Sequence, residues 1–133
     1  MILLDTHAWV WWVHGDSSLL DKHREMLDAS VAEGIAVSII SCWEVAKLVE
    51  YERLELPEAV DLWIETALAY PGVELLHLSP RIVVEATKLP GKFHRDPADQ
   101  LLVATARVLG LALATADRRI VRYDAVETLN LKS

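Results

Sequence analysis

Short apolar runs alternate along the chain with longer segments in which apolar residues recur every three to four positions. The short runs are mostly continuous rather than alternating with polar residues, which is typical of strands buried on both faces of a sheet. Glycine or polar residues separate many of these runs from the neighbouring segments. The runs predict strands at residues 2–5, 35–39, 73–78, 111–115 and 126–129.

The longer segments have the spacing of helices with one apolar face. Gly15 and Gly34 follow two of these segments, whereas Pro57 and Pro80 stand where two others should begin. The predicted helices cover residues 6–14, 18–33, 41–52, 57–70, 80–88 and 96–110. Strands and helices therefore alternate, and this order predicts an α/β fold, a three-layer α/β/α sandwich with a central parallel sheet.

Length and composition agree with a globular protein. The chain has 133 residues, of which 53% are hydrophobic and 25% charged, so we expect a single domain over residues 1–133 with a sizeable core. No apolar run is long enough to span a bilayer, and the start "MILLD" lacks the basic region of a secretory signal. The lone cysteine, Cys42, offers no disulfide. These features predict a cytoplasmic protein.

The formal net charge of −7 argues against nucleic-acid binding, because phosphate contacts require cations. The basic residues are unevenly distributed, however. Seven of the 13 lie between positions 88 and 122: Lys88, Lys92, Arg95, Arg107, Arg118, Arg119 and Arg122. An acidic protein could therefore still carry a basic rim, although a solvated surface would have the same composition.

Five acidic residues fall near predicted strand ends or helix starts: Asp5, Glu44, Asp96, Asp99 and Asp117. The carboxyl ends of parallel strands meet at one edge of a sheet, where ligands bind in open α/β folds. Carboxylates crowded there repel one another, and some take up protons unless a cation neutralises them. An all-oxygen set suits Mg²⁺ or Mn²⁺ rather than zinc. The predicted ligands are Asp5, Glu44, Asp99 and Asp117.

Helix capping is an alternative explanation for each of these acids. In "SCWE", Ser41 could be an N-cap with Glu44 reaching back to it. "DPAD" has the order of a capped helix start, and Asp117 could cap a short helix. Capping explains each acid separately but not why so many should gather at one sheet edge.

The chemistry that fits a carboxylate-held metal is hydrolysis of a phosphodiester. Such an ion activates water and stabilises the charge that develops during the reaction. The sequence has no Ser-His-Asp or Cys-His spacing and no glycine-rich phosphate loop that would favour another mechanism.

Four stretches, in order, resemble the motifs of PIN-domain ribonucleases, specifically the VapC-type toxins of bacterial toxin–antitoxin pairs. They are "MILLDTHAWVWW", "VSIISCWEVAKLVEYERLELP", "HRDPADQLLVATA" and "LATADRRI", and together they extend over nearly the whole chain. The resemblance implies a PIN-like fold and catalytic, metal-binding roles for Asp5, Glu44, Asp99 and Asp117. It places Asp96 beside the site and Thr115 as the hydroxyl that accompanies the last acid.

The same resemblance implies Mg²⁺- or Mn²⁺-dependent cleavage of RNA, a homodimer, and a cognate antitoxin that covers the site. The chain departs from the common family pattern at two positions, where it has Ala98 and Gln100. These departures concern substrate contacts rather than the metal ligands.

Other polar residues are candidates for supporting roles. Thr6 follows Asp5 and could bond a neighbouring carboxylate, although it also suits a helix start. His94, Arg95, Arg118 and Arg119 are candidate substrate-binding residues, with an ordinary loop or solvated helix as the alternative.

The tryptophans of the first predicted helix divide between two faces. Trp9, Trp12 and Val13 share one face and are expected in the core, whereas Trp11 points away from it.

Two other function classes remain open from the sequence. One is a non-catalytic interaction module whose acids only cap helices. The other is a phosphoacceptor signalling domain, which would want an aspartate at the end of a central strand. "VELLHLSP" has none there, which disfavours the second class.

Overall fold

The computed structural model describes residues 1–132, so Ser133, the last residue of the predicted domain, lies outside the described residues. Five strands form one sheet in the order β3-β2-β1-β4-β5, and every neighbouring pair is parallel. The strands are β1 (Ile2–Leu4), β2 (Ile35–Ser38), β3 (Val73–Leu76), β4 (Ala112–Thr115) and β5 (Thr128–Asn130). All five predicted strands are confirmed, most of them shortened by a residue or two.

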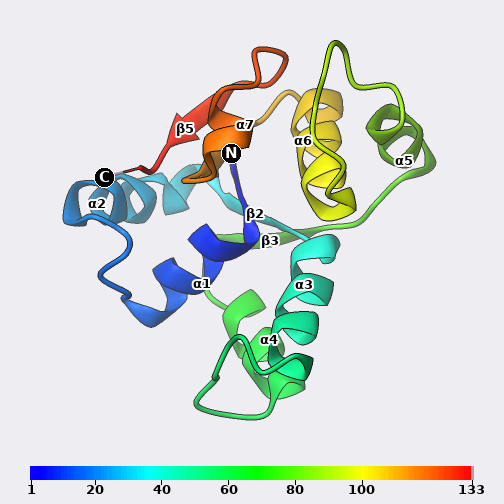
Figure 1. Cartoon of the computed structure of the whole chain (residues 1–133). Helices are drawn as coiled ribbons and strands as arrows, with labels where there is room; N and C mark the ends of the chain where they lie inside the picture. The colour runs from blue at the N-terminus through cyan, green and yellow to red at the C-terminus, as the bar shows by residue number, and fades with distance from the viewer. Residues whose placement is uncertain (133) are drawn as a thin grey trace.

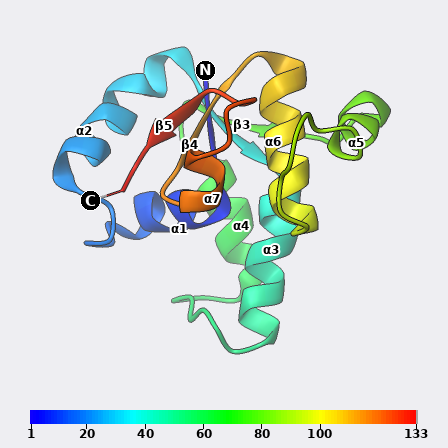
Figure 2. The same cartoon turned by 45° about the horizontal axis from the view of Figure 1, so that its top comes forward.

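Helices cover both faces of this sheet (Figure 1). They are α1 (Thr6–His14), α2 (Asp21–Ser30), the 3-10 turn η1 (Val31–Glu33), α3 (Ile39–Glu50), α4 (Val60–Leu68), α5 (Pro80–Ala86), α6 (Pro97–Leu109) and α7 (Arg118–Val121). Helices α1, α2 and α4 pack on one face of the sheet, and α6 and α7 pack on the other. Helix α5 lies against α6 (Figure 2). The predicted three-layer α/β/α sandwich is confirmed.

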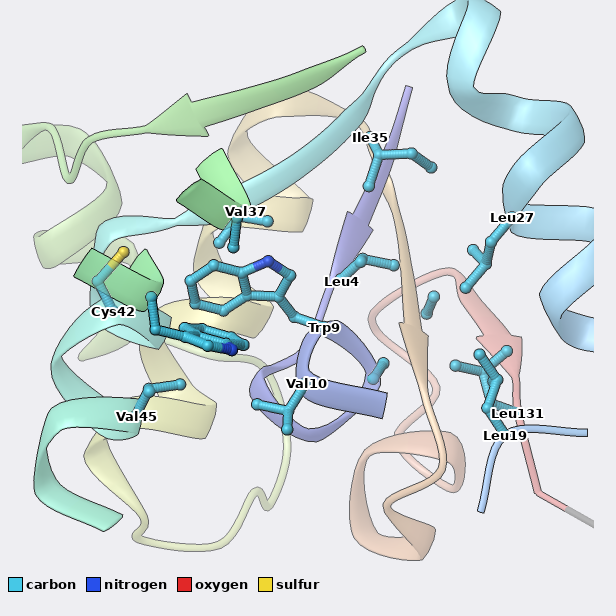
Figure 3. Packing of buried hydrophobic residues seen from close by; sticks show 14 residues of the cluster. Leu4, Trp9, Val10, Leu19, Leu27, Ile35, Val37, Cys42, Val45 and Leu131 are labelled. Atoms are coloured by element: carbon cyan, nitrogen blue, oxygen red, sulfur yellow. The ribbon is translucent and has the colours of Figure 1, made fainter. Parts of the chain in front are cut away.

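Alternate residues of the strands point into two hydrophobic cores, one on each face of the sheet. Leu4 and Val37 point to the face covered by α1 and α4, whereas Leu3 and Ala36 point to the face covered by α6. All four are fully buried, as the continuous apolar runs predicted. Figure 3 shows the indole of Trp9 among the labelled side chains of the first core.

The tryptophan-rich face of α1 is only partly in the core. Trp9 is fully buried, but Trp12 is half-buried and donates through Nε1 to Asp28 at 2.9 Å. Val13 is 40% exposed, so its predicted place in the core is wrong. It lies in the last turn of α1. Trp11 is half-buried rather than fully at the surface.

Three predicted helix starts are wrong by two or three residues. The helix predicted from residue 41 begins at Ile39, because Ser38 ends β2 and its hydroxyl accepts from the N–H of Ile40. The helix predicted from Pro57 begins at Val60, after a bend that contains the proline. The helix predicted from residue 18 begins at Asp21, because Asp16 holds the preceding residues in a turn by accepting from the N–H of Ser18.

The strand order sets the position of the site. From β1 the chain builds outward through β2 and β3, then crosses back through α6 and adds β4 and β5 on the other side of β1. The order therefore reverses between β1 and β4, and ligands of open parallel sheets bind at the carboxyl ends of strands at such a point. Asp5 directly follows β1, and Asp117 follows β4 by two residues. Among residues 1–132, no helix is both long and apolar enough to cross a membrane.

Candidate active site

Asp5 is a buried carboxylate held at both oxygens. Its Oδ1 caps α1 by accepting from the N–H of Ala8 at 2.8 Å, and its Oδ2 accepts from the hydroxyl of Thr115 at 2.5 Å. The same hydroxyl accepts from the N–H of Asp117 at 2.9 Å, so the end of β4 is tied to the end of β1. Burial raises the pKa of Asp5 above its ordinary value, although both hydrogen bonds act in the opposite direction.

Glu44 lies in the second turn of α3, and it does not cap that helix. The alternative of a capping box in "SCWE" is wrong, because Ser38 is the N-cap and Ser41 is already inside the helix. Oε1 of Glu44 instead accepts from the hydroxyl of Thr6 at 2.5 Å, and that hydroxyl lies 2.9 Å from Oγ of Ser41. Burial raises the pKa of Glu44, and the nearby charge of Asp96 adds to the effect.

Asp96 and Asp99 have different roles at the start of α6. Oδ1 of Asp96 accepts from the N–H groups of Ala98 and Asp99, at 3.0 and 3.3 Å, and Pro97 occupies the first helical position. Asp96 is thus the predicted N-cap, which leaves the side chain of Asp99 available for other contacts. Oδ2 of Asp99 lies 3.1 Å from Nε2 of His94 and 3.6 Å from Nη2 of Arg119.

The environment of Asp99 is unfavourable to its ionised form. Burial raises the pKa of Asp99 to about 7, and the charges of Asp96, Asp117 and Glu44 contribute to the rise. Burial and the charge of Arg119 lower the pKa of His94. Asp99 and His94 therefore face each other without forming a strong ion pair.

Asp117 caps the four-residue helix α7, as predicted, by accepting from the N–H of Arg119 at 2.8 Å. The guanidinium of Arg119 also reaches Oδ2 of Asp117 at 3.2 Å. Burial acts to raise the pKa of Asp117, but the hydrogen bonds and charge of Arg119 outweigh it and leave that pKa below its ordinary value. Arg119 bridges Asp117 and Asp99 and is 59% exposed.

These side chains line one cavity of about 260 Å³, which we call the acid pocket. Its lining residues are Asp5, Thr6, His7, Trp11, Glu44, Asp96, Asp99, Ala116, Asp117 and Arg119. The carboxylates come from the ends of β1 and β4 and from the helices α3 and α6. All five acids singled out from the sequence are thus brought together.

The other candidate residues from the sequence differ in whether they lie at the acid pocket. Thr6 lines the acid pocket, and Thr115 contacts Asp5 from beneath it. His94 touches Asp99 although it does not line the pocket, whereas the exposed Arg95 and Arg118 neither line it nor contact its acids. Gln100, at one of the departures from the family pattern, donates to the backbone oxygen of His94 at 3.0 Å.

Nothing in the sequence favours Arg119 over its neighbour Arg118 as a contact of these acids. The two differ only in where the single turn of α7 directs them, which depends on the cap at Asp117.

The donor set fits a hard divalent cation. Within residues 1–132, no three His, Cys, Asp or Glu side chains converge closely enough to form a complete cage for an ion. Mg²⁺ does not require such a cage, because it usually keeps several waters and takes one or two carboxylates directly. Asp5, Glu44 and Asp99 all have raised pKa values, so a cation in the pocket would relieve an existing electrostatic cost.

Comparison with known proteins agrees with this architecture. The family model described as "PIN domain" matches residues 2–126, which is nearly the whole chain. The chain belongs to the PIN-domain family. The resemblance found in the sequence motifs is therefore confirmed, and the acid pocket lies where the PIN fold of this chain reverses its strand order.

Individual relatives of this PIN-family chain include a named ribonuclease. This chain is 34% identical over 119 residues to Ribonuclease VapC22 of Mycobacterium tuberculosis, and the match covers 90% of this chain and 88% of that protein. A chain of the DNA-bound VapBC structure from Salmonella typhimurium matches with a TM-score of 0.74 and 17% identity, covering 98% and 99% of the two chains. A chain of a toxin–antitoxin complex from Klebsiella pneumoniae matches with a TM-score of 0.69 and 17% identity, covering 100% and 99%.

Proposed function

We propose that the protein is a Mg²⁺- or Mn²⁺-dependent endoribonuclease that hydrolyses RNA phosphodiester bonds and acts as the toxin of a toxin–antitoxin pair. One observation carries the proposal. Glu44 and Asp99 have no capping role, yet they share the acid pocket with Asp5 and Asp117. The alternative of a non-catalytic module whose acids only cap helices does not account for those two residues. Similarity to Ribonuclease VapC22 supports the same activity.

The chain's own residues suggest their roles. Asp5, Glu44, Asp99 and Asp117 would hold the ion, which would supply an activated water and stabilise charge on the phosphodiester. Thr115 keeps Oδ2 of Asp5 in place. Thr6 does the same for Oε1 of Glu44. Asp5 is buried and Glu44 is half-buried, which limits competition from bulk water at these carboxylates.

Two residues at the mouth of the pocket are placed to meet substrate. Arg119 is exposed and already spans Asp99 and Asp117, so its guanidinium can turn toward a phosphate once those acids hold a cation. His94 lies beside Asp99, where its ring can donate a hydrogen bond to a bound phosphate. Of the four substrate-binding candidates, this proposal keeps His94 and Arg119, whereas Arg95 and Arg118 do not line the pocket.

Cleavage of RNA tests the proposal. We expect the wild-type protein to cleave RNA with Mg²⁺ or Mn²⁺, and Asp5→Asn and Asp99→Asn to lose at least about a hundredfold in rate, since even outer-shell changes at metal sites cost ten- to a hundredfold. Asp61→Asn is the matched control, because Asp61 is exposed on α4 away from the pocket. Circular dichroism checks that each variant is folded. Equal rates in all four proteins would refute the assignment.

The proposal extends to the partners and the assembly of the protein. We propose a cognate antitoxin protein that covers the acid pocket, a homodimer as the assembly, a cytoplasmic location, and one domain over residues 1–133. The fold shared with chains of VapBC and toxin–antitoxin complexes supports the antitoxin. Expression of the chain alone should arrest growth, and Asp99→Asn should not. Light scattering of the purified protein measures the assembly, and a monomer at micromolar concentration would rule out the homodimer.

A further inference from the structure

A second hollow adjoins the acid pocket. It has a volume of about 560 Å³ and is formed by the loop before α6 and the segment after α7. Its lining residues are Pro90, Gly91, Lys92, Phe93, His94, Arg119, Arg122, Tyr123, Asp124 and Ala125. Arg119 lines both cavities, and His94 contacts Asp99 from this side. A ligand could therefore extend from one cavity into the other.

Three aromatic rings form one wall of this hollow. The ring centroid of Phe93 lies 4.4 Å from that of His94 and 4.8 Å from that of Tyr123. Phe93 and Tyr123 also pack against the core cluster beneath α6. The hydroxyl of Tyr123 donates to the backbone oxygen of Pro90 at 2.5 Å, which fixes its ring to the loop. The wall is thus held in place before any ligand arrives.

The charge of the hollow is opposite to that of the protein as a whole. Lys92, Arg119 and Arg122 contribute three positive charges against the single acid Asp124, although the net charge of the chain is −7. Lys92 and Arg122 are exposed, so they can reach a ligand without leaving a buried partner. Cations beside fixed aromatic rings are the combination that single-stranded nucleic acids bind, with bases stacked on rings and phosphates on the cations.

We infer that this hollow binds a nucleotide of single-stranded RNA next to the phosphate in the acid pocket. The base stacks on the wall formed by Phe93 and Tyr123, Lys92 and Arg122 bind the adjoining phosphates, and Arg119 links the two cavities. The inference rests on the proposed nuclease function and deepens it, because it assigns to the substrate a nucleotide-binding site outside the acid pocket. In duplex RNA each base is already stacked on its neighbours, so the faces of the bases are not available to stack on Phe93 or Tyr123.

Binding can be measured without cleavage. The probe is a fluorescein-labelled 12-nucleotide single-stranded RNA of random sequence, titrated by anisotropy with the Asp99→Asn protein in EDTA. Lys92→Glu with Arg122→Glu should weaken binding about tenfold or more, and should reduce the salt slope by about 1.4, which is roughly 0.7 for each phosphate that is no longer neutralised. The control is Lys22→Glu with Arg53→Glu, which changes the net charge equally at exposed positions outside the hollow.

A second arm tests stacking. Phe93→Leu should weaken binding about fivefold or more, whereas Phe93→Tyr, which keeps the ring, should not. A probe of the same length without bases should bind the Phe93→Leu protein as it binds the parent, and the RNA duplex should bind less tightly than the single strand. Thermal unfolding confirms that each variant is folded.

The outcomes separate this inference from the proposed function. Equal weakening by the control pair, equal affinity for duplex and single strand, or no effect of Phe93→Leu would overturn the nucleotide site even if the protein cleaves RNA. Conversely, the protein could bind single-stranded RNA with the expected differences between variants and yet cleave no RNA. That result would support the nucleotide site and refute the nuclease proposal.

Discussion

Among single residues, the acids of the pocket differ in how each is held. Both oxygens of Asp5 accept hydrogen bonds, from Ala8 and Thr115. Within residues 1–132, Oδ2 of Asp99 has only His94 and the exposed Arg119 near it as ion-pair partners, and three other acids oppose the ionisation of Asp99. The pKa of Asp99, raised to about 7, therefore makes its protonation sensitive to pH near neutrality.

The pKa of Asp99 predicts a pH dependence of stability. Its pKa of about 7 in the folded protein exceeds the ordinary 3.8, so the folded state binds a proton that the unfolded state has lost. The resulting stabilisation is complete below about pH 4 and disappears as the pH rises through 7. In EDTA, the free energy of unfolding should fall between pH 6 and 8 by on the order of 1 kcal/mol, allowing for partial exposure.

Urea unfolding at several pH values measures this change. Asp99→Asn cannot ionise, so its free energy of unfolding should vary less over the same range. An identical pH dependence in wild type and Asp99→Asn would show that another group is responsible.

Thr115 gives a second prediction about a single side chain. Its hydroxyl donates to buried Asp5, and Thr115→Val keeps the shape of the side chain while leaving Oδ2 of Asp5 unpaired. We expect a loss of roughly 1–3 kcal/mol in the free energy of unfolding, because a buried acceptor loses its partner. Thr115→Ser keeps the hydroxyl and should lose less than about half of that. Urea unfolding of both variants at pH 8 tests the difference, and equal losses would mean that the hydroxyl bond to Asp5 contributes no more than the methyl group does.

Among the helices and strands, local sequence predicted some boundaries well and others poorly. Asp96 and Pro97 begin α6, and Gly110 ends it, as expected, because cap, proline and glycine all agree there. The predicted start of α3 at residue 41 was wrong, because both Ser38 and Ser41 suit an N-cap. The end of β2 decides between them, and the length of a strand depends on its pairing partners. Local chemistry therefore could not resolve that boundary, and the role of Glu44 depended on it.

The turn that leads into β3 is set by a contact between elements. Gly72 has φ of +85°, and a Cβ there would lie 2.4 Å from Cγ1 and 2.7 Å from the backbone oxygen of Val31. Gly72→Ala should therefore lower the free energy of unfolding by roughly 2–4 kcal/mol. Gly110→Ala is the matched control, because φ there is +67° and nothing lies within 4 Å of the added atom. It should cost only about 1 kcal/mol. Thermal unfolding measures both, and equal losses would contradict the close contact with Val31.

Across the whole molecule, the parallel sheet explains why the acids could be predicted from the sequence but their neighbours could not. Asp5 and Asp117 follow strands, and the carboxyl ends of parallel strands must share an edge. Nothing comparable constrains Arg119 or the loop that carries Lys92 and Phe93. Their positions depend on how α7 and the segment before α6 pack together, which local periodicity does not encode.

Because the acids come from β1, α3, α6 and the end of β4, a bound ion would join elements that are far apart in the sequence. An ion that binds only the folded state stabilises it by about 2.7 kcal/mol at a hundred times its dissociation constant. Mn²⁺ should therefore raise the unfolding temperature of the wild-type and Asp61→Asn proteins in a saturable way. Asp99→Asn should show a much smaller rise. Calorimetry at constant ionic strength measures these shifts, and an equal rise in all three proteins would place the ion outside the acid pocket.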